Sequence, residues 1–150
     1  MKLVALAALA LWIPVANADK DDPDKTACKL LRYDVAETFL DGILMHMDAS
    51  VIADGFACHY RASAPAHEVR GTIDIALYPK AAKRFDSELA KLGPHPVALS
   101  KVGDRAMRSA DSKKILIGKG DRVVRVTIDP QGVEIASKVP ALAKTIAGNL

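Results

Sequence analysis

The sequence predicts an α+β fold: an antiparallel sheet of about five strands with helices packed on one face. Stretches of alternating apolar and polar residues, the period of a half-buried strand, come in groups and do not alternate one by one with helices. Elsewhere, apolar residues recur at three- and four-residue steps, which is typical of one helix face. The 150 residues contain no internal repeat or linker. We therefore expect a single domain over residues 27–150.

The first half of this domain is expected to hold one helix and two or three strands. Apolar residues at helical spacing predict a helix from Val35, which Gly42 ends. Residues 43–55 predict a strand or an irregular segment. Residues 56–63 and 68–78 both alternate between apolar and polar side chains, and each predicts a strand.

The second half is expected to add a helix, a hairpin and a closing helix. Residues 79–94 have the clearest helical pattern, which ends at Gly93. Residues 113–129 predict a hairpin that turns within Gly-Lys-Gly-Asp. Residues 133–150 predict the closing helix, which either begins at a Ser137 cap with Pro140 in its first turn or is longer and kinked at Pro140. The hairpin residues expected to face the core are Ile115, Ile117, Val124, Val126 and Ile128, and those of the closing helix are Val139, Leu142, Ala143, Ile146 and Leu150.

A secretory signal peptide is predicted over residues 1–18. Lys2 is followed by a short apolar run and then by Val-Ala-Asn-Ala, with small residues at the −3 and −1 positions of a cleavage site after Ala18. The run is shorter than the roughly 20 apolar residues of a membrane-spanning helix, and no cysteine for lipid attachment follows it. We expect an exported, soluble protein without a transmembrane segment, periplasmic or extracellular. Residues 19–26 are highly charged and predict a flexible acidic tail.

Cys28 and Cys58 are the two cysteines of the chain. Two cysteines in an exported protein of this size usually pair, and the closed loop would be worth roughly 3–4 kcal/mol. A metal or redox role and a cysteine nucleophile are the alternatives. His59 could act as the base of such a nucleophile, but neighbouring residues of a strand point to opposite faces. The disulfide is therefore our prediction.

Three short motifs span most of the mature chain: Cys28 with Leu30 and Leu31, Cys58 with Tyr60, and Val102-Gly103-Asp104 with Ala106. In these motifs the sequence resembles a family of small secreted or lipid-anchored cell-envelope domains. That family is best represented among actinobacterial lipoproteins and has no established function. The resemblance implies a disulfide and an α+β fold, and it carries no catalytic residues. Members often have a lipid-attachment cysteine, which this chain lacks.

His46 lies between Met45 and Met47 and is the strongest candidate metal ligand, because imidazole and thioether groups suit copper. On a strand, however, the two methionines point one way and the histidine points the other. Core methionines beside a surface histidine are therefore the simpler interpretation. The remaining histidines, His59, His67 and His95, have no ligand spacing. We predict no metal and no cofactor.

The motifs also give little support to an enzyme. Asp104 follows Gly103, and in Gly-Asp turns the glycine adopts positive φ while the aspartate accepts backbone hydrogen bonds, so we predict a structural role for both. Ser100 and Ser109 lack the G-x-S-x-G pattern, and no phosphate loop or dinucleotide motif occurs. No catalytic residue is predicted.

Charge is distributed unevenly along the mature chain. Residues 19–78 have six Lys and Arg against eleven Asp and Glu, whereas residues 79–150 have fourteen against seven. An ordinary solvated surface would explain this pattern, and a site for an acidic partner is the alternative. Nucleic acid is not the expected partner, because the chain is exported and has few aromatic residues that could stack on bases.

The predicted hairpin suggests where such a partner would bind. With a Lys119-Gly120 loop, Lys114 would lie opposite Arg125 and Leu116 opposite Val123, all on the outward side. This arrangement is a cationic rim around an exposed apolar pair. The candidate binding surface consists of Lys114, Leu116, Val123, Arg125, Arg105 and Arg108.

The sequence favours an exported, non-enzymatic binding or interaction domain of the cell envelope or periplasm. Its partner would be a protein or an anionic envelope component. A periplasmic inhibitor or immunity protein against an envelope-degrading enzyme is a second interpretation. A metal-dependent or hydrolytic enzyme is the third.

Overall fold

The computed structural model describes residues 26–65 and 68–150. The predicted signal peptide and nearly all of the predicted tail lie outside these residues, as does His67. Among the residues described, no helix is long and apolar enough to cross a membrane.

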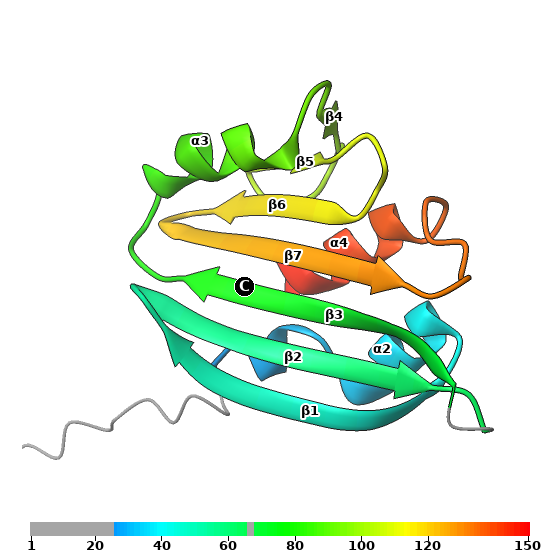
Figure 1. Cartoon of the computed structure of the whole chain (residues 1–150). Helices are drawn as coiled ribbons and strands as arrows, with labels where there is room; N and C mark the ends of the chain where they lie inside the picture. Colours follow the sequence, from blue (N-terminus) through cyan, green and yellow to red (C-terminus); the bar gives the residue numbers. More distant parts are fainter. Residues whose placement is uncertain (1–25, 66–67) are drawn as a thin grey trace, which may run out of the picture.

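Seven strands form one antiparallel sheet in the order β1-β2-β3-β7-β6-β5-β4 (Figure 1). The α+β class is confirmed, but the sheet is larger than the five strands expected. The difference comes from β4 and β5, which are too short for their alternation to stand out in the sequence. The strands are β1 (Ile43–Ile52), β2 (Gly55–Ser63), β3 (Val69–Tyr78), β4 (Val97–Ala98), β5 (Arg105–Arg108), β6 (Lys114–Lys119) and β7 (Arg122–Pro130).

The helices lie on both faces of the sheet, and the expectation that they share one face was wrong. The inner face is covered by α2 and α4, and the outer face, over β6 and β7, by α3 (Figure 1). The helical elements are η1 (Cys28–Leu30), α2 (Tyr33–Leu40), α3 (Arg84–Leu89), η2 (Ala90–Leu92) and α4 (Val139–Gly148).

Each face of the sheet has its own apolar core. The inner core joins α2 and α4 to alternate residues of the central strands, among them the five hairpin residues predicted to face inward. The outer core is smaller, and it joins α3 and η2 to residues that point the other way from β3, β6 and β7. Its buried members are Ala76, Tyr78, Phe85, Leu92, Leu116 and Val123.

The predicted disulfide between Cys28 and Cys58 is confirmed, and it ties η1 to β2. Tyr60, two residues further along β2, is fully buried, and its hydroxyl lies 3.0 Å from the carbonyl of Cys28 and 2.9 Å from that of Leu31. Burial raises the pKa of the Tyr60 phenol. The covalent bond and this hydrogen-bonding group together fix the start of the domain on the inner face.

Candidate functional site

The outer face of the hairpin differs from the expected surface because α3 covers it. Leu116 is fully buried and Val123 is 1% exposed, so the prediction that they form an exposed apolar pair was wrong. Both side chains pack against the outer core together with Phe85 of α3. Because α3 covers these two apolar side chains, only the charged residues around the helix remain accessible as a binding surface.

The register of the hairpin also differs from the expectation. The turn is Gly120-Asp121, with Gly120 at a φ of 58°, and not Lys119-Gly120. Glycine first in a two-residue turn suits its positive φ. The pairing therefore shifts by two residues, so that Lys114 lies opposite Thr127 and Arg125 opposite Leu116. A shift of two keeps every side chain on its predicted face, but the like charges no longer face each other.

Around α3, several cations converge on one buried carboxylate. Glu88 is only 1% exposed, and its two oxygens accept from Lys91 Nζ at 2.8 Å and from Arg125 Nη1 at 2.8 Å. Arg84 Nε lies 3.4 Å from Glu88 Oε1, one helical turn earlier. Arg84 and Lys91 belong to α3 and η2, whereas Arg125 comes from β7. The cluster thus joins the helix to the sheet.

Burial raises the pKa of the Glu88 carboxyl, but the hydrogen bonds from Lys91 and Arg125 outweigh this effect and hold the pKa below its ordinary value. Glu88 is therefore ionised at neutral pH. A buried carboxylate needs such partners, so this cluster also anchors α3. One carboxylate does not neutralise all the cations that contact it, and their side chains reach solvent, with Arg84 28% and Arg125 33% exposed.

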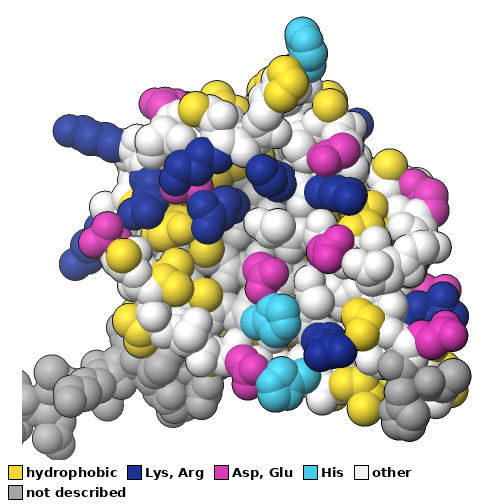
Figure 2. Space-filling view, in the orientation of Figure 1, with side chains coloured by type: hydrophobic (Ala, Val, Ile, Leu, Met, Phe, Trp, Pro, Cys, Tyr) yellow, Lys and Arg dark blue, Asp and Glu magenta, His cyan; other side chains and the backbone are white. Residues whose placement is uncertain are grey.

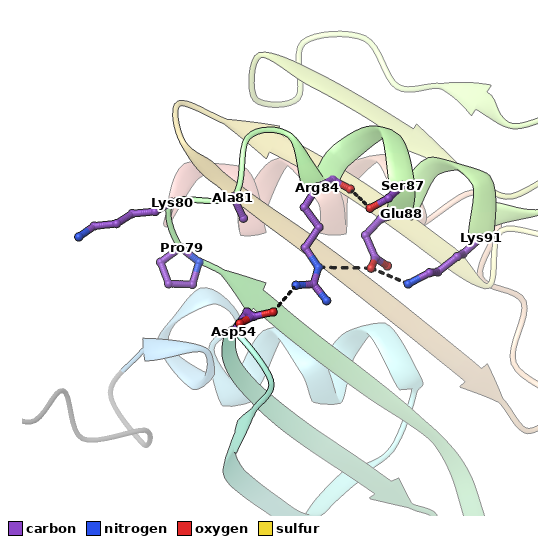
Figure 3. A pocket seen from close by; sticks show the side chains of 8 residues that line it. All are labelled: Asp54, Pro79, Lys80, Ala81, Arg84, Ser87, Glu88 and Lys91. Atoms are coloured by element: carbon purple, nitrogen blue, oxygen red, sulfur yellow. Dashed lines mark hydrogen bonds and ion pairs between the residues drawn. The ribbon is translucent and has the colours of Figure 1, made fainter.

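A cleft of about 570 Å³ opens beside this cluster (Figure 3). Its lining includes Glu88 and three cations, Lys80, Arg84 and Lys91. Arg84 extends from α3 towards the β1–β2 turn, where its Nη1 lies 3.2 Å from Asp54 (Figure 3). The guanidinium also stacks over the ring of Tyr78, 3.8 Å from its centroid. These contacts hold Arg84 in place at the cleft.

A second hollow, of about 250 Å³, shares Glu88 and Lys91 with the cleft. Lys114, Arg125 and Thr127 line it, so two residues of the predicted surface are brought together here. Lys114 Nζ donates to the carbonyl of Lys91 at 3.1 Å. Lys and Arg side chains gather over this part of the face (Figure 2). We call the group formed by Lys80, Arg84, Lys91, Lys114 and Arg125 around Glu88 the α3 cationic site.

The other predicted surface residues are not part of this site. Arg105 lies on the opposite flank of α3, where its guanidinium stacks over Phe85 at 3.7 Å and pairs with Asp86 at 3.1 Å. Arg108 is half-buried and donates to Ser112 Oγ at 2.9 Å and to the carbonyl of Ser109 at 3.2 Å. Arg108 therefore stabilises the loop between β5 and β6.

The turn residues Gly103 and Asp104 support the same hairpin. Gly103 has a φ of 56°, and the Asp104 carboxylate accepts from the Gly120 amide at 2.6 Å. The Asp104 amide donates to the carbonyl of Gly118 at 2.9 Å. Asp104 thus holds the β6–β7 turn against the start of β5.

His46 and His59 lie on the outer face of β1 and β2, beside the part that α3 covers. His46 pairs with Asp48 and His59 with Asp74, each at 2.5 Å. Met45 and Met47 are 56% and 45% exposed, so the expectation of core methionines was wrong. A bulge after Leu44 interrupts the alternation there. Within residues 26–65 and 68–150, no group of three or more His, Cys, Asp or Glu is placed to hold a metal ion.

Sequence reasoning missed Glu88, although a signal was present. Arg84, Glu88 and Lys91 have the i, i+4 and i, i+3 spacing of neighbours on one helix surface. This spacing is common on solvated helices, and it could not show that the carboxylate is buried or that Arg125 of β7 completes the cluster.

No family model matches the chain, and no curated protein and no solved structure matches it either. The resemblance to secreted envelope domains stays a prediction.

Proposed function

We propose that the chain is an exported binding domain of the cell envelope or periplasm, and that it holds an anionic partner at the α3 cationic site. The observation that carries this proposal is the excess of cations there. Five Lys and Arg side chains line the cleft and the neighbouring hollow, against the two carboxylates of Asp54 and Glu88. Carboxylate or phosphate groups of a partner would neutralise the remaining positive charge.

The fixed position of these cations also supports binding. Arg84 is held by Asp54, Glu88 and Tyr78, and Arg125 by Glu88. Side chains that are already ordered lose less conformational entropy when a partner arrives. Arginine further presents a planar fork that suits carboxylate and phosphate groups, and both arginines remain partly open to solvent.

The disulfide supports the exported location that we propose. Disulfides persist in oxidising compartments and are rare in the cytosol, and the Cys28–Cys58 bond joins two buried residues of the inner core. The predicted signal peptide over residues 1–18 points to the same compartment.

Titration with two fluorescent polymers tests the proposal: poly-L-glutamate supplies carboxylates and polyphosphate supplies phosphates. We expect at least one of them to bind at low ionic strength and to dissociate as salt rises, because salt screens exposed charges. The test variant Lys80→Glu/Lys114→Glu changes two cations of the site that make no ion pair with Glu88. It should weaken binding by about tenfold or more.

The matched control is Lys29→Glu/Lys144→Glu, which makes the same change in net charge on η1 and α4, away from the outer face. Its affinity should stay within about twofold of the wild type, a difference of less than 0.5 kcal/mol. Equal losses in both variants would show that only net charge matters, and the absence of binding to either polymer would refute the site. Circular dichroism of both variants checks that they fold.

A further inference from the structure

β1 is a long strand at the free edge of the sheet. It has ten residues and pairs with β2 alone among the strands described, and it forms the lower edge in Figure 1. Six large apolar side chains of the described chain are exposed, and four of them are on β1. They are Ile43, Met45, Met47 and Val51, with 52%, 56%, 45% and 68% exposure. Exposed apolar residues are therefore concentrated on the strand with an unpaired side.

The register of the β1–β2 hairpin shows which backbone groups face outward. Ile52 and Gly55 flank a two-residue turn, so they exchange hydrogen bonds with each other, and every second residue of β1 before Ile52 does the same with β2. The residues between them, Met47, Ala49 and Val51, therefore direct their amides and carbonyls away from β2. They present three donors and three acceptors at the open edge.

The two ends of this edge differ. At Leu44 the edge is closed by α2, because its amide donates to Glu37 at 2.9 Å and its carbonyl accepts from the Tyr33 hydroxyl at 2.6 Å. A bulge follows at once, between Leu44 and His46. Bulges, and backbone groups already hydrogen-bonded to side chains, prevent another strand from pairing at an edge. From Met47 to Val51 the strand has no proline, lysine or arginine that would do so.

The opposite edge of the sheet is protected. It is formed by β4, which has two residues, and Pro96 comes directly before it. A very short edge strand next to a proline offers little backbone for pairing. The chain thus protects one edge of its sheet and one end of the other edge, and leaves a five-residue stretch of β1 open.

We propose that two copies of this chain pair through β1, antiparallel, about a two-fold axis at Ala49. The outward-facing groups of Met47, Ala49 and Val51 are symmetric about that residue. Met47 of one copy would lie opposite Val51 of the other, Ala49 opposite Ala49, and each pair would exchange two backbone hydrogen bonds. The two sheets would become one.

The side chains that meet in this register fit each other. Met47, Ala49 and Val51 lie opposite the inner-face residues of β2, so they point to the face of the inner core. Pairing would extend that core with two Met–Val contacts, one on each side of the Ala49–Ala49 pair at the axis. On the outer face, Asp48 would lie opposite the partner's Ser50, so no like charges meet.

Neighbouring registers are less favourable. An axis at Asp48 would place the two Asp48 carboxylates opposite each other, which costs stability. An axis at Met47 would place Ala49 opposite Met45, within the bulge, where the regular ladder is interrupted. The axis at Ala49 uses all three outward-facing residues and avoids both problems. An isologous contact needs such self-complementarity, and this is why the occupant we infer is a second copy.

Sedimentation equilibrium of the purified protein over a range of micromolar concentrations tests the pairing, and we expect a reversible dimer. Met47→Lys and Val51→Glu should each raise the dimer dissociation constant by about tenfold or more, because each buries a single charge against an apolar residue. The double variant Met47→Lys/Val51→Glu should recover dimerisation, because in this register each lysine faces the partner's glutamate.

The control is Val97→Lys on β4, which is the same kind of change at the other edge and should leave the dimer intact. A wild type that stays monomeric at every concentration would overturn the proposal. So would a dimer that both single variants leave unchanged, or one that only Val97→Lys disrupts. If the single variants are monomeric and the double variant does not recover dimerisation, the register with its axis at Ala49 would be overturned. Circular dichroism establishes folding in each case.

Discussion

At the scale of single residues, the most consequential contacts join η1 to β2. Cys28 is covalently bound to Cys58, and the Tyr60 hydroxyl satisfies carbonyls of the same turn. The loop closed by the disulfide separates the two cysteines by 30 residues and contains α2 and β1. Loss of the disulfide would raise the conformational entropy of the unfolded chain, and we therefore expect the folded state to become markedly less stable.

The variant Cys28→Ser/Cys58→Ser should lower the free energy of unfolding by roughly 2–5 kcal/mol, as the loss of native disulfides in small domains usually does. Urea denaturation followed by circular dichroism measures the change. Wild-type protein in reducing buffer is the control, and it should lose a similar amount. A loss below about 1 kcal/mol in both samples would contradict the role assigned to the bond.

Glu88 should make stability depend on pH. Its folded-state pKa lies below the ordinary value of 4.5, so its ionised form contributes stability above that value and loses it as pH falls through the lower folded-state pKa. At pH 7, Glu88→Gln should cost about 1–3 kcal/mol, because Lys91 and Arg125 lose the carboxylate with which they pair. The gap between wild type and variant should narrow as pH falls from 4.5 towards 2.

Urea titrations at pH 7, 4 and 2.5 measure this gap. Glu68→Gln is the control, because Glu68 is exposed and makes no ion pair within the described residues. It should change stability by less than about 0.5 kcal/mol at each pH. If the cost of Glu88→Gln were constant over this range, ionisation of Glu88 would not be its source.

At the scale of elements, α3 explains most of the departures from expectation. The helical pattern over residues 79–94 predicted one long helix, but the ordered α-helix is α3, with six residues, and it continues as η2. Lys80 adopts a φ of 53°, and the Ala81 amide donates to the carbonyl of Asp121 in the hairpin turn. A left-handed residue interrupts a helix, so the first part of the segment becomes a link between β3 and α3.

The packing of α3 depends on a glycine of β6. A β-carbon on Gly118 would lie 3.0 Å from the Phe85 ring and 3.4 Å from the Arg105 side chain. Gly118→Ala should therefore displace Phe85 and cost about 1–3 kcal/mol, as overpacking of a filled site does. Thermal denaturation measures the loss.

Gly148→Ala is the matched control, because a β-carbon there meets nothing within 4 Å. This variant should be unchanged or up to about 1 kcal/mol more stable, since alanine has the higher helix propensity. If Gly118→Ala were equally well tolerated, the close approach of α3 to β6 would not matter for stability.

At the scale of the whole molecule, the sheet separates two environments. The inner face holds the larger core and the disulfide. The outer face holds α3, the α3 cationic site and the His–Asp pairs. The proposed ligand and the proposed second copy would use different parts of the protein, the outer face and the β1 edge. Binding and pairing can therefore be measured independently.

Export is tested by intact-mass measurement of the protein purified from its native cells. We expect the mature chain to begin at Asp19, after cleavage behind Ala18. Trp12 is the only tryptophan, so the processed protein should also lack tryptophan fluorescence. A mature chain that retains Trp12 would contradict the predicted signal peptide, while the fold and the two proposed surfaces would be unaffected.

The sequence by itself determined the local features of this protein. Period-two alternation located β2, β3, β6 and β7 and the face to which each of their side chains points, because that period is set by strand geometry. The presence of two cysteines, together with the predicted signal peptide, led to the prediction of the disulfide. Helical spacing located α2 and α4 and most of their buried residues, since an apolar stripe on a helix must be covered by other apolar groups.

Only the tertiary structure decided which surfaces meet. An apolar stripe shows that a helix packs, but not on which face of a sheet, and so the burial of Leu116 and Val123 under α3 was not predictable from periodicity. The pairing in the β6–β7 hairpin depended on the single residue at which the turn begins, Gly120. The cluster around Glu88 joins positions 84 to 125, and side chains so far apart in sequence come together only after the sheet and helix have packed.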